Sequence, residues 1–274
     1  MTPAIGLALR EENRVVLDEP ALSAVEVTFE RANDDLRIEN YVGGMDFDYV
    51  SVHALKLSPA SADPPKTDYL DAVRRVADEN GADSISDHLG FTRDGDDGVE
   101  LGHFSVPPFT SVALDVTCEN IEIIQNYFGE RHFFIENIAY LFQFDGEMSE
   151  AEFLNAVLAR TGCGWLLDVT NVYANALNHR YDAYEFIRSV MPSAGRVQIH
   201  LAGGFFEEDG IYIDSHSHPI PKEVWELYEF ALMIGRGKVD AVFIERDQNF
   251  PDESGWRGEV RKARDLAERQ SVTS

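Results

Sequence analysis

The sequence predicts a (β/α)8 TIM-type barrel, and three observations support this fold class. The chain has 274 residues, an ordinary length for one such barrel. Eight short apolar runs alternate with longer stretches, most of them helical in periodicity, which is the pattern of βα units on a parallel sheet. No Pro/Ser linker, low-complexity tract or fixed-period repeat divides the chain. We therefore expect a single barrel domain over residues 1–274.

The expected elements follow from local patterns of apolar residues. Apolar runs predict strands at 4–9, 24–28, 49–52, 84–86, 133–135, 164–167, 196–199 and 241–244. Helical periodicity predicts helices at 68–80 and 110–127, one that begins at Ser149, and further helices at 183–190, 222–234 and 258–269. Ser149 and Glu152 have the spacing of a capping box, which marks the start of their helix.

Two connections are too long for plain turns and are expected to carry function. Residues 90–108 read as a hairpin around 94–98, and residues 201–221 are rich in His, Asp and Gly. Both follow predicted strands, so both lie on the catalytic face of a barrel. These two loops are the candidates for contact with a substrate.

Composition excludes several classes of function. Hydrophobic residues make up 44 % of the chain, enough for a core and against global disorder. With 23 Lys and Arg against 49 Asp and Glu, the net charge of -26 would repel a phosphate backbone, so nucleic acid is not expected as a partner. Cys118 and Cys163 show no paired spacing. No segment has the apolar length of a membrane span, and we expect a cytoplasmic protein.

Metal-binding side chains stand at the ends of six successive predicted strands. They are His53, His88, Glu136, Asp168, His200 and Glu245. The carboxyl ends of barrel strands meet at one mouth, so these side chains should converge. The second long loop adds Asp214 and His216, and Asn171 lies one turn past Asp168. Imidazole and carboxylate ligands without thiolate suit zinc, manganese or non-heme iron. Nine candidates are too many for one ion and indicate two or three.

Each candidate also has a purely structural interpretation. A lone histidine at a strand end is most often a hydrogen-bonded structural residue, Glu136 could cap a helix, and Asp168 could belong to a turn. Six strand ends with the same chemistry nevertheless favour a metal site. The structural interpretation is preferred for the four remaining histidines, which are His103, His132, His179 and His218.

Several motifs around these residues occur in a characteristic order and spacing. They are Ser51-Val52-His53-Ala54-Leu55-Lys56-Leu57-Ser58, Ser86-Asp87-His88-Leu89, Ile135-Glu136-Asn137, Leu167-Asp168-Val169-Thr170-Asn171-Val172-Tyr173, His200-Leu201-Ala202-Gly203 and Asp214-Ser215-His216. The chain resembles, over residues 5–247, the multinuclear non-heme iron-dependent oxidative enzymes, the family of the methanobactin-biosynthesis oxidase. The resemblance implies a (β/α)8 barrel that binds two or three irons in mixed Fe(II)/Fe(III) states and uses O2.

The resemblance also implies ligand sets and partners. The first iron would be bound by His53, His88 and Glu136. Glu136 would be shared with the second iron, which Asp168, His200 and Glu245 would also bind. Asn171, Asp214 and His216 would bind the third. The substrate would be a residue, cysteine above all, of a ribosomally synthesised precursor peptide, with a separate partner protein presenting the peptide leader. Asp87 or Asp247 is predicted to accept a proton.

Four positions depart from the pattern of this family. Thr28 and Gly204 replace histidines, Thr170 replaces an asparagine, and Arg246 replaces a tryptophan. None removes a predicted ligand, but they indicate an altered pocket.

The main rivals are other metal-dependent barrels. A sugar isomerase or epimerase would use magnesium, manganese or zinc, and its usual catalytic lysine is not evident near the motifs. An apurinic endonuclease is disfavoured by the net charge of -26. A non-catalytic metal-binding barrel is the third alternative.

Overall fold

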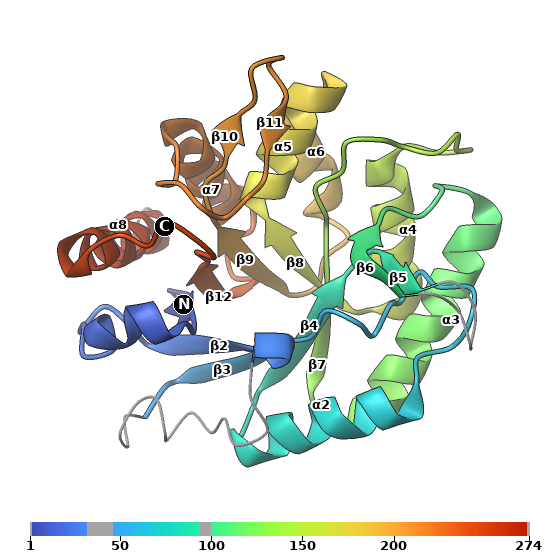
Figure 1. Ribbon diagram of the computed structural model, residues 1–274, viewed down its shortest axis with the longest axis horizontal. Coiled ribbons are helices and arrows are strands. Elements are labelled where there is room, and N and C mark those ends of the chain that lie inside the picture. Colours follow the sequence, from blue (N-terminus) through green and yellow to red (C-terminus); the bar gives the residue numbers. More distant parts are fainter. Residues whose placement is uncertain (1, 32–45, 94–99, 273–274) are drawn as a thin grey trace.

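The barrel is the central feature of the computed structural model, which describes residues 2–31, 46–93 and 100–272. Eight parallel strands close in the order β1-β12-β9-β8-β7-β4-β3-β2 (Figure 1). They are β1 (Ala4–Ala8), β2 (Ala24–Thr28), β3 (Tyr49–His53), β4 (Ser84–His88), β7 (His132–Glu136), β8 (Gly164–Asp168), β9 (Val197–Leu201) and β12 (Val239–Ile244). The predicted fold class is confirmed, and all eight predicted strands form the barrel.

Helices connect most of the strands and cover the outside of the barrel. They are α2 (Thr67–Glu79), α3 (Ser111–Phe128), α4 (Glu150–Thr161), α5 (Val169–His179), α6 (Ala183–Val190), α7 (Lys222–Ile234) and α8 (Glu253–Val272). Short 3-10 turns, η1 (Glu11–Val16) and η2 (Phe29–Arg31), follow the first two strands. The predicted capping box at Ser149 is present.

Helix α5 is not among the predicted helices. It starts at the end of β8, where the Asp168 side chain caps it by accepting a hydrogen bond from Asn171 N at 2.7 Å. Its polar residues Thr170, Asn171 and Asn175 are buried, because they face the barrel mouth and its neighbouring loops. Because α5 follows β8 without an intervening loop, no turn signal marks its start in the sequence.

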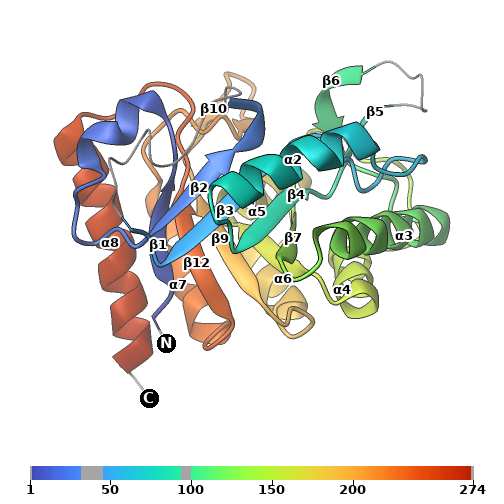
Figure 2. The same ribbon diagram turned by 90° about the horizontal axis from the view of Figure 1, so that it is seen from below.

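Two antiparallel hairpins extend the mouth of the barrel. The first pairs β5 (Phe91–Arg93) with β6 (Glu100–Ser105), which confirms the hairpin predicted in 90–108; its expected tip, 94–98, lies outside the described residues. The second pairs β10 (Phe205–Phe206) with β11 (Tyr212–Ile213). Figure 2 shows both hairpins at one end of the barrel, with both termini toward the other.

Strand alternation fills the barrel interior in layers. Phe134 and Phe243 are fully buried on inward-facing positions, and Gly164 leaves room for the Phe134 ring, which a Cβ there would meet at 2.3 Å. Nearer the amino-terminal ends of the strands, Gln198 Nε2 donates to Ser84 Oγ at 2.8 Å. Glu136 and Glu245 follow two residues after Phe134 and Phe243 and reach the mouth with the other candidate ligands.

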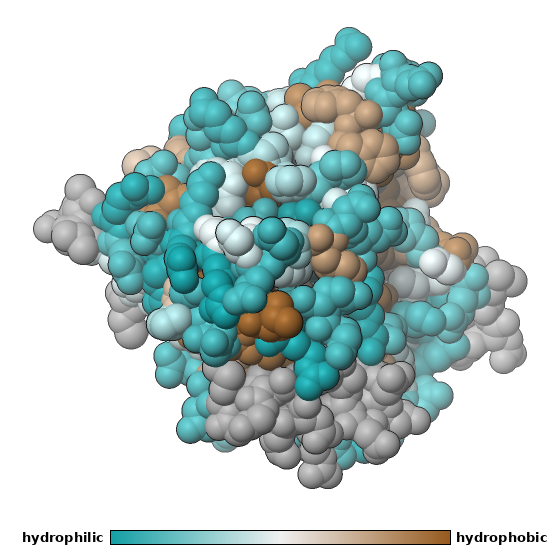
Figure 3. Space-filling model, turned by 60° about the vertical axis from the view of Figure 1, so that its left-hand side comes forward, coloured by the Kyte–Doolittle hydropathy of each residue, from teal (hydrophilic) through white to brown (hydrophobic). Residues whose placement is uncertain are grey.

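The outer surface agrees with the acidic composition. The side of the molecule that carries α8 and the N-terminal strands is mostly hydrophilic, with small separate apolar patches (Figure 3). Cys118 and Cys163 are buried and unpaired, as expected from their spacing. In the part of the chain that the structure describes, no helix combines the length and the apolar character needed to cross a bilayer.

Candidate metal centre

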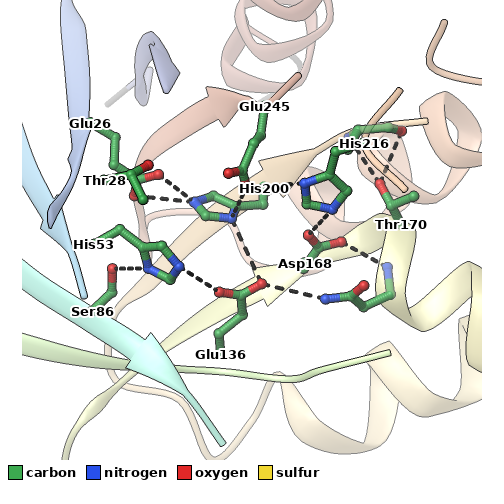
Figure 4. Close-up of polar contacts among 12 residues, drawn as sticks. Glu26, Thr28, His53, Ser86, Glu136, Asp168, Thr170, His200, His216 and Glu245 are labelled. Atoms are coloured by element: carbon green, nitrogen blue, oxygen red, sulfur yellow. Dashed lines mark hydrogen bonds and ion pairs between the residues drawn. The ribbon is translucent and has the colours of Figure 1, made fainter. Parts of the chain in front are cut away.

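The first group of ligand atoms joins three neighbouring strands. His53, His88 and Glu136 end β3, β4 and β7, and all three are buried. The Nε2 atoms of the two imidazoles lie 3.5 and 3.6 Å from Oε2 of Glu136. The other nitrogen of His53, Nδ1, forms a hydrogen bond of 2.9 Å with Ser86 Oγ, which fixes the ring with Nε2 toward the centre (Figure 4). One cation could contact all three side chains.

Glu136 also belongs to a second group, with Asp168 and His200. His200 Nδ1 lies 3.8 Å from Oε1 of Glu136 and 3.3 Å from Oε2 of Glu245. Oδ1 of Asp168 caps α5, which leaves Oδ2 for the centre. Because its two oxygens face different groups, Glu136 is placed to bridge two ions.

His216, in the loop after β9, forms a third group with Glu245 and Asp247. His216 Nε2 lies 3.1 Å from Asp214 Oδ2, and its Nδ1 lies 3.3 Å from Glu245 Oε2. His216 has a positive φ of 48°, an uncommon backbone conformation that turns its ring into the mouth. Asn171 donates to the carbonyl of Asn137 at 3.0 Å. All nine predicted ligands therefore converge at one end of the barrel.

Unpaired polar atoms show that the residues present fit a cation. Among the described residues, six of the buried atoms that make no hydrogen bond belong to predicted ligands, and four of the six lie 3.1–3.7 Å from an oppositely charged group. The six are Glu136 Oε2, Asp168 Oδ2, Asn171 Oδ1, His200 Nδ1, Asp214 Oδ1 and His216 Nε2. Each unpaired buried polar atom costs about 1–3 kcal/mol. Six of them facing one space are accounted for if they coordinate metal ions. The nitrogen and oxygen donor set agrees with zinc, manganese or non-heme iron.

The pKa shifts within the group follow from burial and from the charges of its own members. Burial, with the nearby carboxylates of Asp168 and Glu245, raises the pKa of Glu136 well above its usual value. Burial and Asp214 raise the pKa of Asp168 to about 7. Burial and the neighbouring imidazoles lower the pKa of His53, so it is neutral and able to ligate. A bound cation would relieve the mutual repulsion of the carboxylates and favour their ionised forms.

Two residues of the centre, Glu26 and Arg10, are absent from the sequence-based set. Both oxygens of Glu26, in β2, lie 3.0–3.1 Å from His200 Nε2, and both side chains are completely buried. Although burial opposes it, Glu26 raises the pKa of His200 to about 10. Arg10 donates to Glu245 Oε1 and Asp247 Oδ1 at 2.8 and 2.9 Å. A carboxylate inside an apolar strand was the signal that could have identified Glu26.

The two predicted proton acceptors lie in different surroundings. Asp247 stands at the mouth, with Oδ2 3.9 Å from His216 Nδ1 and Oδ1 held by Arg10. Asp87 is not in any of the three groups, because alternation along β4 turns it away from the interior. It accepts hydrogen bonds from the backbone N–H groups of Leu57 and His88, both at 2.6 Å, and its Oδ1 lies 3.4 Å from the outer nitrogen, Nδ1, of His88. The catalytic roles of both residues stay predictions.

The structure gives a local reason for three of the four departures. Gly204 donates from its backbone N–H to the Tyr212 hydroxyl at 2.8 Å, and a Cβ at Gly204 would lie 2.0 Å from the carbonyl oxygen of Ile213. Thr170 exchanges hydrogen bonds with the backbone of residue 202, and Thr28 accepts one from Arg10 at 3.0 Å. Gly204, Thr170 and Thr28 therefore allow close contacts between neighbouring segments around the mouth.

The fourth departure, Arg246, lies outside the centre. Its guanidinium is buried and pairs with Glu259 of α8 at 3.0 Å. The other four histidines do not join the three groups of ligand atoms. His132 is exposed at the start of β7, and His179 contacts the carbonyl oxygen of Tyr140 at 2.8 Å.

Relatives of the chain were found by sequence and by structure. UPF0276 proteins are similar to it: one from Rhizorhabdus wittichii is 42 % identical over 218 residues, covering 80 % of this chain and 76 % of that protein. Another, from Acaryochloris marina, is 30 % identical over 270 residues, covering 94 % and 92 %.

Solved structures resemble the fold at low identity. Endonuclease IV from Thermus thermophilus has a TM-score of 0.61 and 18 % identity, covering 97 % of this chain and all of that one. An L-ribulose 3-epimerase has a TM-score of 0.58 and 15 % identity, covering 99 % and 95 %. Such identities establish the shared barrel alone. A sequence model of the RiPP precursor modification enzymes MbnB/TglH/ChrH, which act on ribosomally made peptides, matches residues 4–268. The chain belongs to this family.

Proposed function

We propose that this protein is a multinuclear iron-dependent oxidase that uses O2 to modify a cysteine residue of a ribosomally synthesised precursor peptide. The observation that carries the proposal is the sharing of Glu136 between two groups of ligand atoms, with a third group adjoining them through Glu245 and His216. Several ions in one mouth are what such an oxidation requires. Family membership supports a peptide substrate and an enzymatic role.

The iron ions, when bound, would supply an open position for O2 and a Lewis-acidic position for the substrate thiolate. The chain supplies orientation. Ser86 fixes the ring of His53, Glu26 fixes that of His200, and Arg10 holds one oxygen of Glu245. Holding both reactants in one mouth replaces an encounter between separate molecules by a local step. We propose that Asp247, at the rim, accepts a proton released by the substrate through Oδ2, since Oδ1 pairs with Arg10 and Arg31.

The experiment uses iron-reconstituted full-length protein under anaerobic conditions. The peptide comes from a short cysteine-containing reading frame beside the gene, together with the partner protein that we propose presents its leader. We expect no mass change until O2 is admitted, followed by a change confined to the cysteine-containing fragment. Turnover without O2, or full activity with magnesium, manganese or zinc and no iron, would reject the oxidase and favour the epimerase-like alternative.

Matched histidine variants connect this activity to the centre. His53→Asn removes a ligand from the mouth, whereas His132→Asn changes an exposed residue at the opposite end of the barrel. We expect the first variant to lose both iron and turnover and the second to keep both. Equal iron content in the two variants would contradict the assignment of His53.

A further inference from the structure

An apolar groove opens beside the metal centre, and Asp214 is the one predicted ligand among its lining residues. Its volume is about 270 Å³. Three segments from separate parts of the chain form most of its walls: β6 with the residues after it, the loop between β7 and α4, and the β10–β11 hairpin. Asn178 of α5 completes them. Their side chains in the groove include Phe104, Val106, Leu141, Phe142 and Tyr212. The volume is slightly below the roughly 300–1,000 Å³ of common ligand pockets, and it suits one or two side chains of an extended peptide.

The groove is continuous with the centre on two sides. Asp214 lines the groove, and its Oδ2 lies 3.1 Å from His216 Nε2. Phe104 also lines the groove, and its ring stacks on His88 at a centroid distance of 4.0 Å. A side chain seated in the groove is therefore separated from the ligand groups by a single residue on either side. This places the groove where the residue next to a modified residue would lie.

Large apolar side chains surround the opening and are exposed. Leu141 and Phe142 are 59 % and 60 % exposed, and Phe206 on the β10–β11 hairpin is 57 % exposed. Phe142 also contacts the ring of Phe144 edge to face at 5.6 Å. A concave site with exposed aromatic residues at its edge is typical of a binding surface, because water is expelled from it when a ligand is seated.

The rim of the groove is acidic. The turn of the β10–β11 hairpin carries Glu207, Glu208 and Asp209, and the loop between β7 and α4 carries Asp145, all exposed. Neither 139–148 nor 203–214 contains a lysine or an arginine. The charge therefore favours a cationic group over the rim and disfavours an acidic segment.

We propose that this groove binds an apolar or aromatic side chain of the precursor peptide, adjacent in sequence to the modified residue, with a lysine or arginine of the same peptide over the acidic rim. The inference rests on the proposed function and deepens it, because it specifies the substrate as a basic, apolar segment. The loop between β7 and α4, which the sequence does not mark, becomes a determinant of specificity.

The test measures binding of labelled synthetic peptides to the iron-loaded full-length protein by fluorescence anisotropy without O2. Three peptides share one sequence around a cysteine: one carries Phe and Lys beside it, one carries Ser in place of Phe, and one carries Glu in place of Lys. We expect each replacement to weaken binding roughly tenfold or more, since a buried anchor or a charge partner is lost.

Protein variants locate the effect. Phe142→Ser should weaken binding of the Phe peptide about tenfold and leave binding of the Ser peptide unchanged. Met233→Ala, which removes an apolar side chain 49 % exposed on α7, is the matched control and should change neither. Glu208→Gln combined with Asp209→Asn should reduce the preference for Lys over Glu. Iron content should be the same in all of them.

Equal binding of all three peptides, or equal binding by Phe142→Ser and Met233→Ala, would overturn the inference. So would a Phe142→Ser variant that changes only the oligomeric state in light scattering, since a second copy would then cover the groove. Failure of the proposed oxidase is distinguishable: groove-dependent peptide binding with no O2-dependent product rejects the oxidation and leaves the groove assignment intact.

Discussion

Replacing Glu26 by Gln tests how the interior of the barrel supports the metal centre. Glu26 is not itself in any of the three groups of ligand atoms; its oxygens lie 3.0–3.1 Å from Nε2 of His200. That contact leaves the other nitrogen, Nδ1, facing Glu136 and Glu245. Gln keeps the size of the side chain and one carbonyl oxygen but removes the negative charge. The substitution therefore changes the electrostatic support of His200 and little of the packing.

The magnitude follows from what such partners contribute. Carboxylates that orient a ligating histidine change metal affinity by roughly 10- to 100-fold when mutated. This range equals about 1.4–2.8 kcal/mol, since each factor of ten is about 1.4 kcal/mol. We expect the upper part of the range, because both side chains are completely buried and water cannot replace the lost charge. The cost to folding of breaking a buried ion pair, about 3–5 kcal/mol, is an upper limit here, since Glu136 and Glu245 remain beside His200.

The assay is anaerobic titration of metal-free protein with ferrous iron against a competing chelator, with retained iron measured by elemental analysis. Glu150→Gln is the control, since it makes the same replacement of a buried glutamate side chain without changing its charge below about pH 8. Glu150 accepts a hydrogen bond from the Tyr140 hydroxyl at 2.9 Å, outside the centre. Circular dichroism establishes that both variants are folded at the titration temperature.

A folded Glu26→Gln variant that binds iron as tightly as the unchanged protein would show that Glu26 does not support the centre. Equal weakening by Glu26→Gln and Glu150→Gln would lead to the same conclusion, because the effect would then not depend on His200.

Three further outcomes are expected. Gly204→Ala should displace the β10–β11 hairpin and lower the free energy of unfolding by about 1–3 kcal/mol, because the new Cβ would lie 2.0 Å from the carbonyl oxygen of Ile213; unchanged denaturant midpoints would contradict this. Burial raises the pKa of Glu150 to about 8, so the folded state holds a proton that the unfolded state releases above its own pKa near 4.5. The stability that this group contributes is thus present at pH 4 and lost as pH rises to 8. Glu150→Gln should therefore reduce the fall in melting temperature between pH 4 and pH 8. The same fall in the variant and the unchanged protein would contradict this. Removing metal by chelation should lower the melting temperature. Adding ferrous iron at 100 times its dissociation constant should raise the free energy of unfolding by about 2.7 kcal/mol. Identical melting curves with and without iron would show that the folded protein binds none.

The barrel was predictable because its strands are buried on both faces and therefore read in the sequence as short, nearly continuous apolar runs. The same pattern predicts the convergence of His53, His88 and Glu136, since strand ends of a parallel barrel share one mouth. Helix α5 was missed because it begins at Val169, directly after the last residue of β8, so no turn residues separate the helix from the strand.

Other features depend on tertiary contacts that no local pattern reveals. Glu26 lies in the middle of β2, and only closure of the barrel brings it to His200, 174 residues away. Arg10 meets Glu245 because β1 and β12 pair to close the sheet. The groove needs three loops that are distant along the chain, so its apolar residues read in sequence as ordinary surface positions.

Anomalous X-ray diffraction at the iron absorption edge, on crystals grown from iron-replete protein, would locate the ions of the multinuclear centre without reference to activity. We expect at least two iron peaks inside the barrel mouth, one contacted by His53 and His88, and one by Asp168 and His200, with the carboxylate of Glu136 between them. A mouth without anomalous density, or one peak with the remaining side chains turned away from it, would contradict the assignment of a multinuclear centre.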